Sequence, residues 1–162
     1  MSVQPWLAVV ALAGALVGAD HVARQQDRAS TVEVTAKRGL MSAPANIAVG
    51  GGFVAGGELL DGQGRAKVGD GFSHCGVVAV SLAIPPEVTA HCTSVFRLTD
   101  GELHLSGMRT YKSIATGFGD ANLAITGGTG AYANARGEGK ATRLNPTDRQ
   151  DVTYRFTFTI TD

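Results

Sequence analysis

Two His-Cys dipeptides, His74-Cys75 and His91-Cys92, hold the side chains of this sequence best suited to metal or thiol chemistry. Two histidines and two cysteines are a recognised zinc ligand set. Adjacent residues on a strand point to opposite faces, so each dipeptide is split across a sheet and the four ligands do not converge without a bulge. We therefore expect no metal site. Cys75 and Cys92 could instead face each other on antiparallel strands joined near Pro85-Pro86, and an exported chain would bridge them.

The run TGGTG at residues 126–130 has the composition of a phosphate-binding loop. Such a loop is followed by a helix and usually contains Lys before Ser or Thr. Here Ala131 and Tyr132 lead to another glycine-rich strand instead. Because glycine permits positive φ and tight bends between strands, we interpret this run as structural.

These residues lie among eight segments that are alternating or rich in β-branched residues and are separated by Gly, Asp or Pro. The segments are residues 31–36, 53–60, 66–82, 91–99, 102–111, 121–126, 137–144 and 152–160. No helical period follows Thr31, and Asp61-Gly62 and Asp100-Gly101 are hairpin signals. The sequence predicts an all-β fold, an eight-stranded antiparallel up-and-down β-barrel, because closure removes exposed sheet edges.

Alternation assigns faces to two of these strands. In residues 152–160 one face is apolar and predicted to be buried: Val152, Tyr154, Phe156, Phe158 and Ile160. In residues 102–111 one face holds Leu103, Leu105, Gly107, Arg109 and Tyr111, and the other holds Glu102, His104, Ser106, Met108 and Thr110. Either face of this second strand could line a cavity, and we expect His104 to face solvent.

The composition suits one folded domain. The chain has 162 residues, of which 44% are hydrophobic and 17% charged, enough for a single sizeable core. Lys and Arg together number 14, as do Asp and Glu, so the net charge is zero. A nucleic-acid binder normally carries a basic surface, and we therefore expect no nucleic-acid partner.

An uncharged apolar segment spans residues 6–19. Its length fits the apolar region of a signal peptide better than the ~20 residues of a membrane span, but no Lys or Arg precedes it. Three roles stay open: a cleaved signal, a membrane tether, or an apolar helix packed as a lid on the domain or on a partner copy. We predict residues 1–30 as this helical segment with a polar tether, and residues 31–162 as the barrel. A cytoplasmic or membrane-tethered protein is slightly favoured over a secreted one.

Residues 101–111, GELHLSGMRTY, and 122–141, NLAITGGTGAYANARGEGKA, resemble the C-terminal half of the allene oxide cyclase and dirigent barrel family. Residues 56–75, GGELLDGQGRAKVGDGFSHC, resemble its opening pattern of an acidic strand end, a turn and a cysteine-bearing strand. The likeness runs from about Thr31 to the end of the chain and favours the bacterial cyclase branch.

The resemblance implies an apolar cavity, open at one barrel mouth, that catalyses by shape. Allene oxide cyclases close a fatty-acid-derived epoxide, dirigent proteins steer phenoxy-radical coupling, and related bacterial barrels close polyketide chains by cycloaddition. Proximity and orientation supply roughly 7 to 11 kcal/mol in such closures, so no cofactor is required. Our leading hypothesis is a cofactor-independent cyclase that closes a linear polyene or polyketide-like substrate by a pericyclic, Diels-Alder-type step.

The same resemblance supplies candidate catalytic residues. Glu33, in TVEVTAK, matches a glutamate that points into the cavity of allene oxide cyclases, although Thr35 stands where they place an asparagine. Cys75 matches a cavity cysteine, and Tyr111 a tyrosine that contacts substrate. The alternatives are an exposed strand glutamate, an inert core cysteine and a rim or core tyrosine. A bridged Cys75 would exclude its catalytic role.

The candidate substrate-binding residues are aromatic: Phe53, Phe96, Phe118 and Tyr132. The segment Lys112–Asp120 resembles a lengthened loop whose Gly117 and Gly119 suit a mobile mouth or lid. Two other functions stay open: an exported, non-catalytic barrel that binds a hydrophobic small molecule, and a dirigent-like steering protein. Each of these functions implies a hydrophobic small-molecule ligand. A homo-oligomer, either a dimer or a trimer, stays open, since trimers are common among the proteins that this chain resembles.

Overall fold

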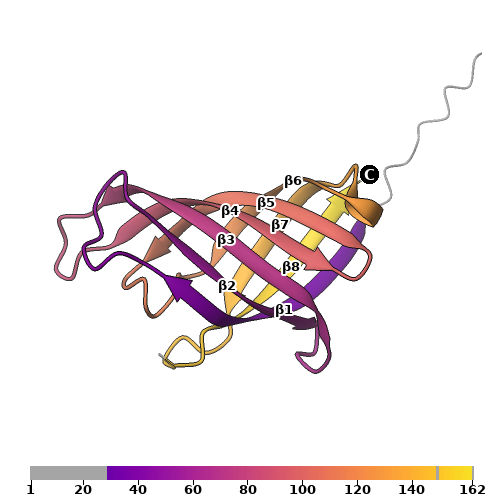
Figure 1. The fold of residues 1–162 in the computed structure, drawn as a ribbon, viewed down its shortest axis with the longest axis horizontal. Helices are drawn as coiled ribbons and strands as arrows, with labels where there is room; N and C mark the ends of the chain where they lie inside the picture. The colour runs from indigo at the N-terminus through magenta and orange to yellow at the C-terminus, as the bar shows by residue number, and fades with distance from the viewer. Residues whose placement is uncertain (1–28, 149, 162) are drawn as a thin grey trace, which may run out of the picture.

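The chain forms a closed barrel of eight antiparallel strands that follow one another in sequence order (Figure 1). The computed structural model describes residues 29–148 and 150–161. The strands are β1 (Ser30–Ser42), β2 (Gly52–Asp61), β3 (Lys67–Val80), β4 (Val88–Leu98), β5 (Gly101–Tyr111), β6 (Ala121–Gly128), β7 (Arg136–Arg143) and β8 (Thr153–Thr161), with a 3-10 turn η1 (Gly130–Tyr132) between β6 and β7. The predicted all-β up-and-down barrel is confirmed, and all eight predicted segments contribute a strand.

The barrel closes where β8 pairs with β1, from Ser30 opposite Ile160 to Lys37 opposite Thr153. The apolar segment predicted at residues 6–19, and its roles as signal, tether or lid, lie outside the described residues. Over residues 29–148 and 150–161, no helix has the length and apolar character needed to cross a membrane.

The interior of the barrel is filled by the inward faces that alternation predicts. On β8 these residues are all buried: Tyr154, Phe156, Phe158 and Ile160. Phe96 of β4 meets Phe156 and Phe158 edge to face, with ring centroids 4.9 and 5.8 Å apart. On β5 the inward face proves to be the one that holds Leu103, Leu105 and Tyr111, since all three are buried. Alternation alone did not say which face of β5 points into the barrel, and the burial of these residues decides it.

The glycine-rich run at residues 126–130 ends β6 and turns the chain into η1. Gly127 and Gly130 have φ values of +142° and +59°, which side-chain-bearing residues rarely adopt. A Cβ on Gly128 would lie 2.1 Å from the carbonyl oxygen of Glu102. Only the three-residue η1 follows, and these glycines therefore serve backbone geometry, as the sequence predicts.

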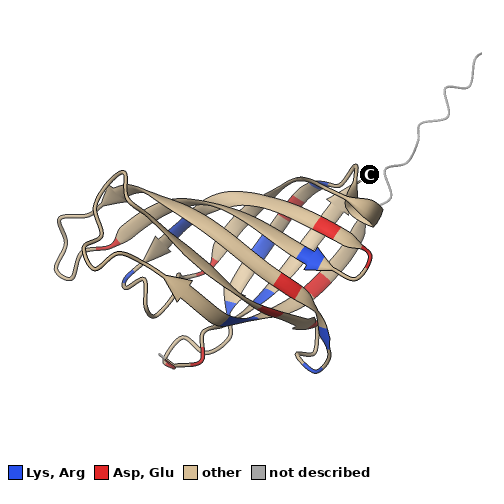
Figure 2. Ribbon diagram, viewed as in Figure 1, with Lys and Arg blue, Asp and Glu red and all other residues tan. Residues whose placement is uncertain are grey.

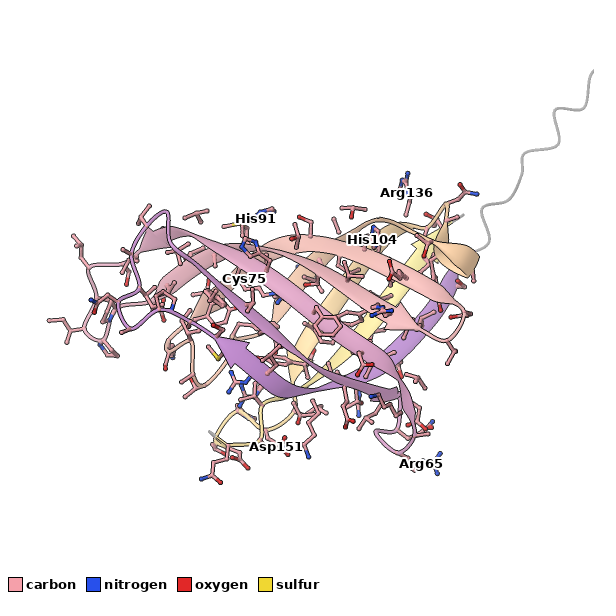
Figure 3. The ribbon with its side chains drawn as sticks, viewed as in Figure 1. Arg65, Cys75, His91, His104, Arg136 and Asp151 are labelled. Carbon is pink, nitrogen blue, oxygen red and sulfur yellow. A yellow bond between two sulfur atoms is a disulfide. The ribbon has the colours of Figure 1, made fainter. Side chains whose placement is uncertain are left out.

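The barrel has two unlike ends. At one end the short β2–β3 turn is held by Asp61, whose carboxylate accepts hydrogen bonds from the backbone N–H groups of Gln63, Arg65 and Ala66. At the other end lie longer segments, residues 43–51, 81–87, 112–120 and 144–152. Figure 3 labels Arg65 in the β2–β3 turn and Asp151 in the segment before β8. We call this second end, which the four longer segments surround, the mouth of the barrel.

Cys75 of β3 and Cys92 of β4 are directly opposite in the strand register and form a disulfide, with their Cα atoms 4.1 Å apart. Both are fully buried, whereas the adjacent His74 and His91 are exposed on the outer face of the barrel. The two His-Cys dipeptides are therefore split across the wall as alternation predicts, and Figure 3 shows Cys75 and His91 on this part of the sheet.

Candidate substrate cavity

A cavity of about 80 Å³ lies inside the barrel at the end where β5 finishes and β8 begins. Six aromatic side chains line it: Phe53, Phe96, Tyr111, Phe118, Tyr154 and Phe156. Small residues opposite them leave the space open, among them Ala36, Ala55 and Gly71. The cavity is therefore an aromatic chamber at the mouth of the barrel. The half of the interior nearer the β2–β3 turn is filled by side chains.

The volume of this cavity limits what it holds in the described conformation. An engineered cavity of about 150 Å³ in another protein binds benzene, and drug-sized ligands occupy about 300 to 1,000 Å³. At about 80 Å³ the chamber accepts part of a conjugated chain or ring. A larger substrate must extend through the mouth, where Arg38 and Met41 line the opening, or displace the loop above it.

The loop of residues 112–120 covers the chamber through contacts with β8. The hydroxyl of Tyr154 accepts a hydrogen bond from the backbone N–H of Phe118 at 2.6 Å and donates one to its carbonyl at 2.8 Å. The two rings stack with centroids 4.1 Å apart and an interplanar angle of 9°. Gly117 has a φ of +86°, and a Cβ there would lie 2.4 Å from the Tyr154 hydroxyl, so glycine is required for this close approach.

Two arginines fix the same loop, Arg38 from the lining of the chamber and Arg143 from outside it. Arg143 donates a hydrogen bond to the carbonyl of Thr116, and its guanidinium lies over the Tyr154 ring, 5.4 Å from the centroid. Arg38 donates to the carbonyls of Ile114 and Ala115. Partial burial lowers the pKa of Arg38, and the charge of nearby Arg143 lowers it further. The predicted loop, residues 112–120, thus covers the chamber and is packed against it. That this loop moves to open the chamber stays a prediction.

A third arginine, Arg109 of β5, lies inside the chamber and is only 4% exposed. Its Nη1 donates to the hydroxyl of Ser73 at 3.2 Å, and its Nη2 donates to the hydroxyl of Ser94 at 2.7 Å. The guanidinium carbon stands 4.7 Å from the centroid of the Phe118 ring. The stacked rings of Phe118 and Tyr154 thus each carry a cation: Arg109 lies over Phe118, and Arg143 lies over Tyr154.

Tyr111 supplies a polar group near this guanidinium. Its hydroxyl lies 3.8 Å from the sulfur of Cys75 and 3.7 Å from that of Cys92, both weak hydrogen-bond acceptors. Burial raises the pKa of the Tyr111 phenol, and the positive charge of Arg109 opposes this shift. The phenol is therefore neutral at physiological pH, and the acceptors in contact with its hydroxyl are the two weak sulfur acceptors.

The structure brings four of the predicted site residues together. Tyr111, Phe53, Phe96 and Phe118 all line the chamber. Phe53 meets Tyr111 edge to face at 5.2 Å, and Phe118 meets Tyr111 at 5.7 Å. The four predicted residues thus share one cavity, and their contact with a substrate stays a prediction.

The other three predicted site residues lie elsewhere or carry no free reactive group. The expectation that Glu33 points into the cavity is wrong: its carboxylate is exposed on the outer face, where it accepts a hydrogen bond from Thr157. Cys75 is bonded to Cys92 and has no thiol to act with. Tyr132 belongs to η1 at the opposite end, where its hydroxyl donates to Asp100 at 3.3 Å. Burial and this carboxylate raise the pKa of Tyr132 to about 12.

The predicted site residues do not include three polar side chains of the lining that bond to the loop or carry charge: Arg38, Arg109 and Tyr154. Arg109 and Tyr154 alternate with buried apolar residues on β5 and β8, so each could have been found by asking which polar residues occupy an otherwise apolar face. Arg38 could not have been found in this way, because the predicted first strand ends at Ala36 and β1 continues to Ser42.

Comparison with known proteins places the chain in a family. Residues 29–156 match the model of the allene oxide cyclase barrel like domain, and the protein belongs to this family. No curated protein sequence matches the chain.

Solved structures share the fold. A pyocyanin demethylase has a TM-score of 0.61 and 20% identity, covering 81% of this chain and 99% of its own. AbnU, described as an exo-specific intermolecular Diels-Alderase, has a TM-score of 0.58 and 17% identity, covering 82% and 98%. A pterocarpan synthase dirigent protein has a TM-score of 0.59 and 18% identity, covering 84% and 97%. At these identities the likeness concerns the barrel alone, which hosts different activities.

Proposed function

We propose that this barrel is a cofactor-independent cyclase that folds a linear, conjugated polyene or polyketide-like substrate inside its aromatic chamber and closes it by a [4+2] cycloaddition. In such a step two carbon–carbon σ bonds form as π bonds are consumed, and the product is an isomer of the substrate. The observation that carries the proposal is the chamber itself, walled by six aromatic side chains and covered by a loop. Proximity and orientation in such a site are worth roughly 7 to 11 kcal/mol.

The family and its neighbours support this reaction class. The matched family is named for allene oxide cyclase. AbnU is described as a Diels-Alderase, and another protein of this fold is described as a nonspecific heme-binding cyclase that catalyses a [4+2] cycloaddition during neoabyssomicin biosynthesis. Most side chains in the walls of the chamber are apolar, as a hydrophobic small-molecule substrate requires.

The proposal is tested by incubating the purified protein with linear polyenes that carry a diene and a separate alkene. Cyclisation would remove the ultraviolet absorbance of the conjugated chain and give a product of unchanged mass and shorter chromatographic retention. Replacing Ala55 by Phe fills the chamber and should abolish the acceleration. Val54→Phe, one residue away on the outer face, is the matched control and should retain it. Equal rates with and without protein across the series would refute the cyclase.

The disulfide favours a second candidate, an exported barrel that binds a hydrophobic molecule without transforming it. Disulfides persist mainly in oxidising compartments, and Cys75 and Cys92 are bridged. Intact-mass measurement on protein from its native host separates this candidate from an intracellular enzyme. A mass that lacks roughly the first twenty to thirty residues, with bridged cysteines, would support export. A full-length mass with two free thiols would oppose it.

A dirigent-like steering role receives less support from the chamber. Such a role would be favoured by carboxylates and tyrosines around the bound radicals. Among the described residues, those lining the chamber include Tyr111 and Tyr154 but no Asp or Glu.

A further inference from the structure

The guanidinium of Arg109 is a buried cation without a counter-ion in the described part of the chain. The residue is 4% exposed, and none of the ion pairs formed by residues 29–148 and 150–161 involves it. Its two hydrogen-bond partners, Ser73 and Ser94, are neutral hydroxyls. Hydroxyl groups satisfy individual N–H donors but do not neutralise a charge, and the Phe118 ring 4.7 Å away attracts the cation without neutralising it. Arg109 therefore has no anionic partner among the described residues.

Arg109 also has an unused donor. A guanidinium presents five N–H bonds, and Nε of Arg109 is fully buried without a hydrogen-bond partner among the described residues. A buried donor left unpaired is unfavourable, and native proteins usually satisfy it by a ligand or by ordered water. Beside it, the Tyr111 hydroxyl contacts the two disulfide sulfurs and lies close enough to the Arg109 guanidinium for that cation to oppose the rise that burial causes in the pKa of the phenol. Among the described residues, the Arg109 Nε–H therefore has no acceptor, and the Tyr111 O–H has only weak sulfur acceptors.

The charged residues of the strands are unevenly distributed along the barrel. The acidic residues carried by strands are Glu33, Glu58, Asp61, Asp70, Glu102 and Glu138, and all lie in the half of the barrel nearer the β2–β3 turn (Figure 2). The strand residues nearer the mouth include Arg38, Arg109 and Arg143. Around the chamber itself the described strands therefore carry arginines and no Asp or Glu, whereas the loops at the mouth carry Glu87, Asp120, Asp148 and Asp151. The positive charge of these strands thus lies in the wall of the chamber, whereas the acidic residues of this end lie at its entrance.

We propose that the substrate of this chamber carries a conjugated carboxylate, which Arg109 binds through its guanidinium with the Tyr111 hydroxyl as a second donor. This inference rests on the proposed function and adds the chemical class of its substrate. A carboxylate is planar and matches the guanidinium fork. A phosphate dianion would bring more charge than one buried arginine balances. The aromatic walls then receive the apolar remainder of the molecule.

The bound carboxylate also has a chemical consequence. Arg109 and Tyr111 would hold one end of the substrate at a fixed point and withdraw electron density from a carbon–carbon double bond conjugated with it. An electron-poor alkene is the better partner for a diene in a cycloaddition. The same two residues would thereby position the chain and polarise the reacting bond.

Two probes of the same shape test the inference: trans-cinnamate, a conjugated carboxylate, and trans-cinnamamide, its neutral amide. Dissociation constants are measured by isothermal titration calorimetry at pH 7, where the carboxylate is ionised. We expect the full-length protein to bind cinnamate about tenfold or more tightly than cinnamamide. Arg109→Met should remove this preference. Arg155→Met, which deletes an exposed arginine of β8, is the charge-matched control and should keep it.

The outcomes separate this inference from the proposed function. Equal affinity of the wild-type protein for both probes would overturn the carboxylate site and leave the apolar chamber standing. Failure to bind either probe would overturn both. Should Arg109→Met not fold, the Nε–H signal of Arg109 in ¹⁵N-labelled wild-type protein gives the answer. Cinnamate should shift that signal downfield more than cinnamamide does, and an unchanged signal at saturating cinnamate would contradict the site.

Discussion

The guanidinium carbon of Arg109 stands 4.7 Å from the centre of the Phe118 ring, so a buried strand residue and the loop that covers the cavity meet face to face. A cation over an aromatic face is attracted by the electrons of the ring. Because Phe118 also stacks on Tyr154, the position of the loop and the position of the charge are coupled. We therefore expect a ligand that binds Arg109 to change the position of the loop of residues 112–120.

Removing the charge should stabilise the empty protein. An unpaired buried cation is costly, and replacing buried ions by apolar residues of similar volume is often neutral or stabilising by about 1 to 4 kcal/mol. In Arg109→Met the hydroxyls of Ser73 and Ser94 can still bond each other, as they do now at 2.7 Å. We expect the free energy of unfolding in urea to rise by about 1 kcal/mol or more. A loss of several kcal/mol would show that the arginine has a structural role.

Removing the hydrogen bonds between the loop of residues 112–120 and Tyr154 of β8 should open the chamber. Tyr154→Phe keeps the ring stack and removes both hydrogen bonds to Phe118, which we expect to cost about 1 to 3 kcal/mol of stability. Amide hydrogen exchange in residues 112–120 should accelerate. Tyr132→Phe deletes a hydroxyl at the other end of the barrel and serves as the control. Equal exchange rates in all three proteins would argue against this role of the Tyr154 hydroxyl.

The strand pattern was predictable from the sequence because it depends on local alternation. On β8 the apolar face from Tyr154 to Ile160 is the buried face, and the Asp61-Gly62 and Asp100-Gly101 signals fall between strands that pair. The site was only partly predictable. Phe53 and Tyr111 meet across the barrel interior, a contact between distant strands that alternation can permit but not specify. Glu33 failed because a motif match does not fix which side of the wall a strand residue takes.

The disulfide is expected to contribute stability rather than chemistry. It links residues separated by 17 positions, and closing a loop of this size is worth about 3 kcal/mol. The double variant Cys75→Ala, Cys92→Ala should unfold at lower urea concentration and still prefer cinnamate over cinnamamide. The single variant Cys92→Ala leaves a free thiol at Cys75 and directly tests the catalytic role that the sequence suggested for Cys75. Faster cyclisation by that variant than by wild type would restore Cys75 as a reactive residue.

The tyrosines predict a dependence on alkaline pH. The chain has three of them, and all have raised pKa values: burial raises those of Tyr111 and Tyr154, and burial with Asp100 raises that of Tyr132 to about 12. An unfolded tyrosine titrates near pH 10, so the native state holds its protons more tightly. The stabilisation is complete below about pH 10 and is lost as the pH rises toward 12.

Two measurements check this dependence. Tyrosinate absorbance at about 295 nm should rise at higher pH in the native protein than in denaturant, and the free energy of unfolding should fall between pH 10 and pH 12. Tyr132→Phe should remove part of that fall. Native and denatured titration curves that coincide would contradict the buried phenols.

The most direct test of the chamber is a crystal structure of the protein with trans-cinnamate bound. We expect the phenyl ring between Phe53, Tyr111 and Phe118, and a carboxylate oxygen within hydrogen-bonding distance of the Arg109 Nε and the Tyr111 hydroxyl. We also expect the loop of residues 112–120 to have shifted to make room. Cinnamate bound outside the barrel, or inside it with its carboxylate turned away from Arg109 toward the mouth, would rule out this binding mode.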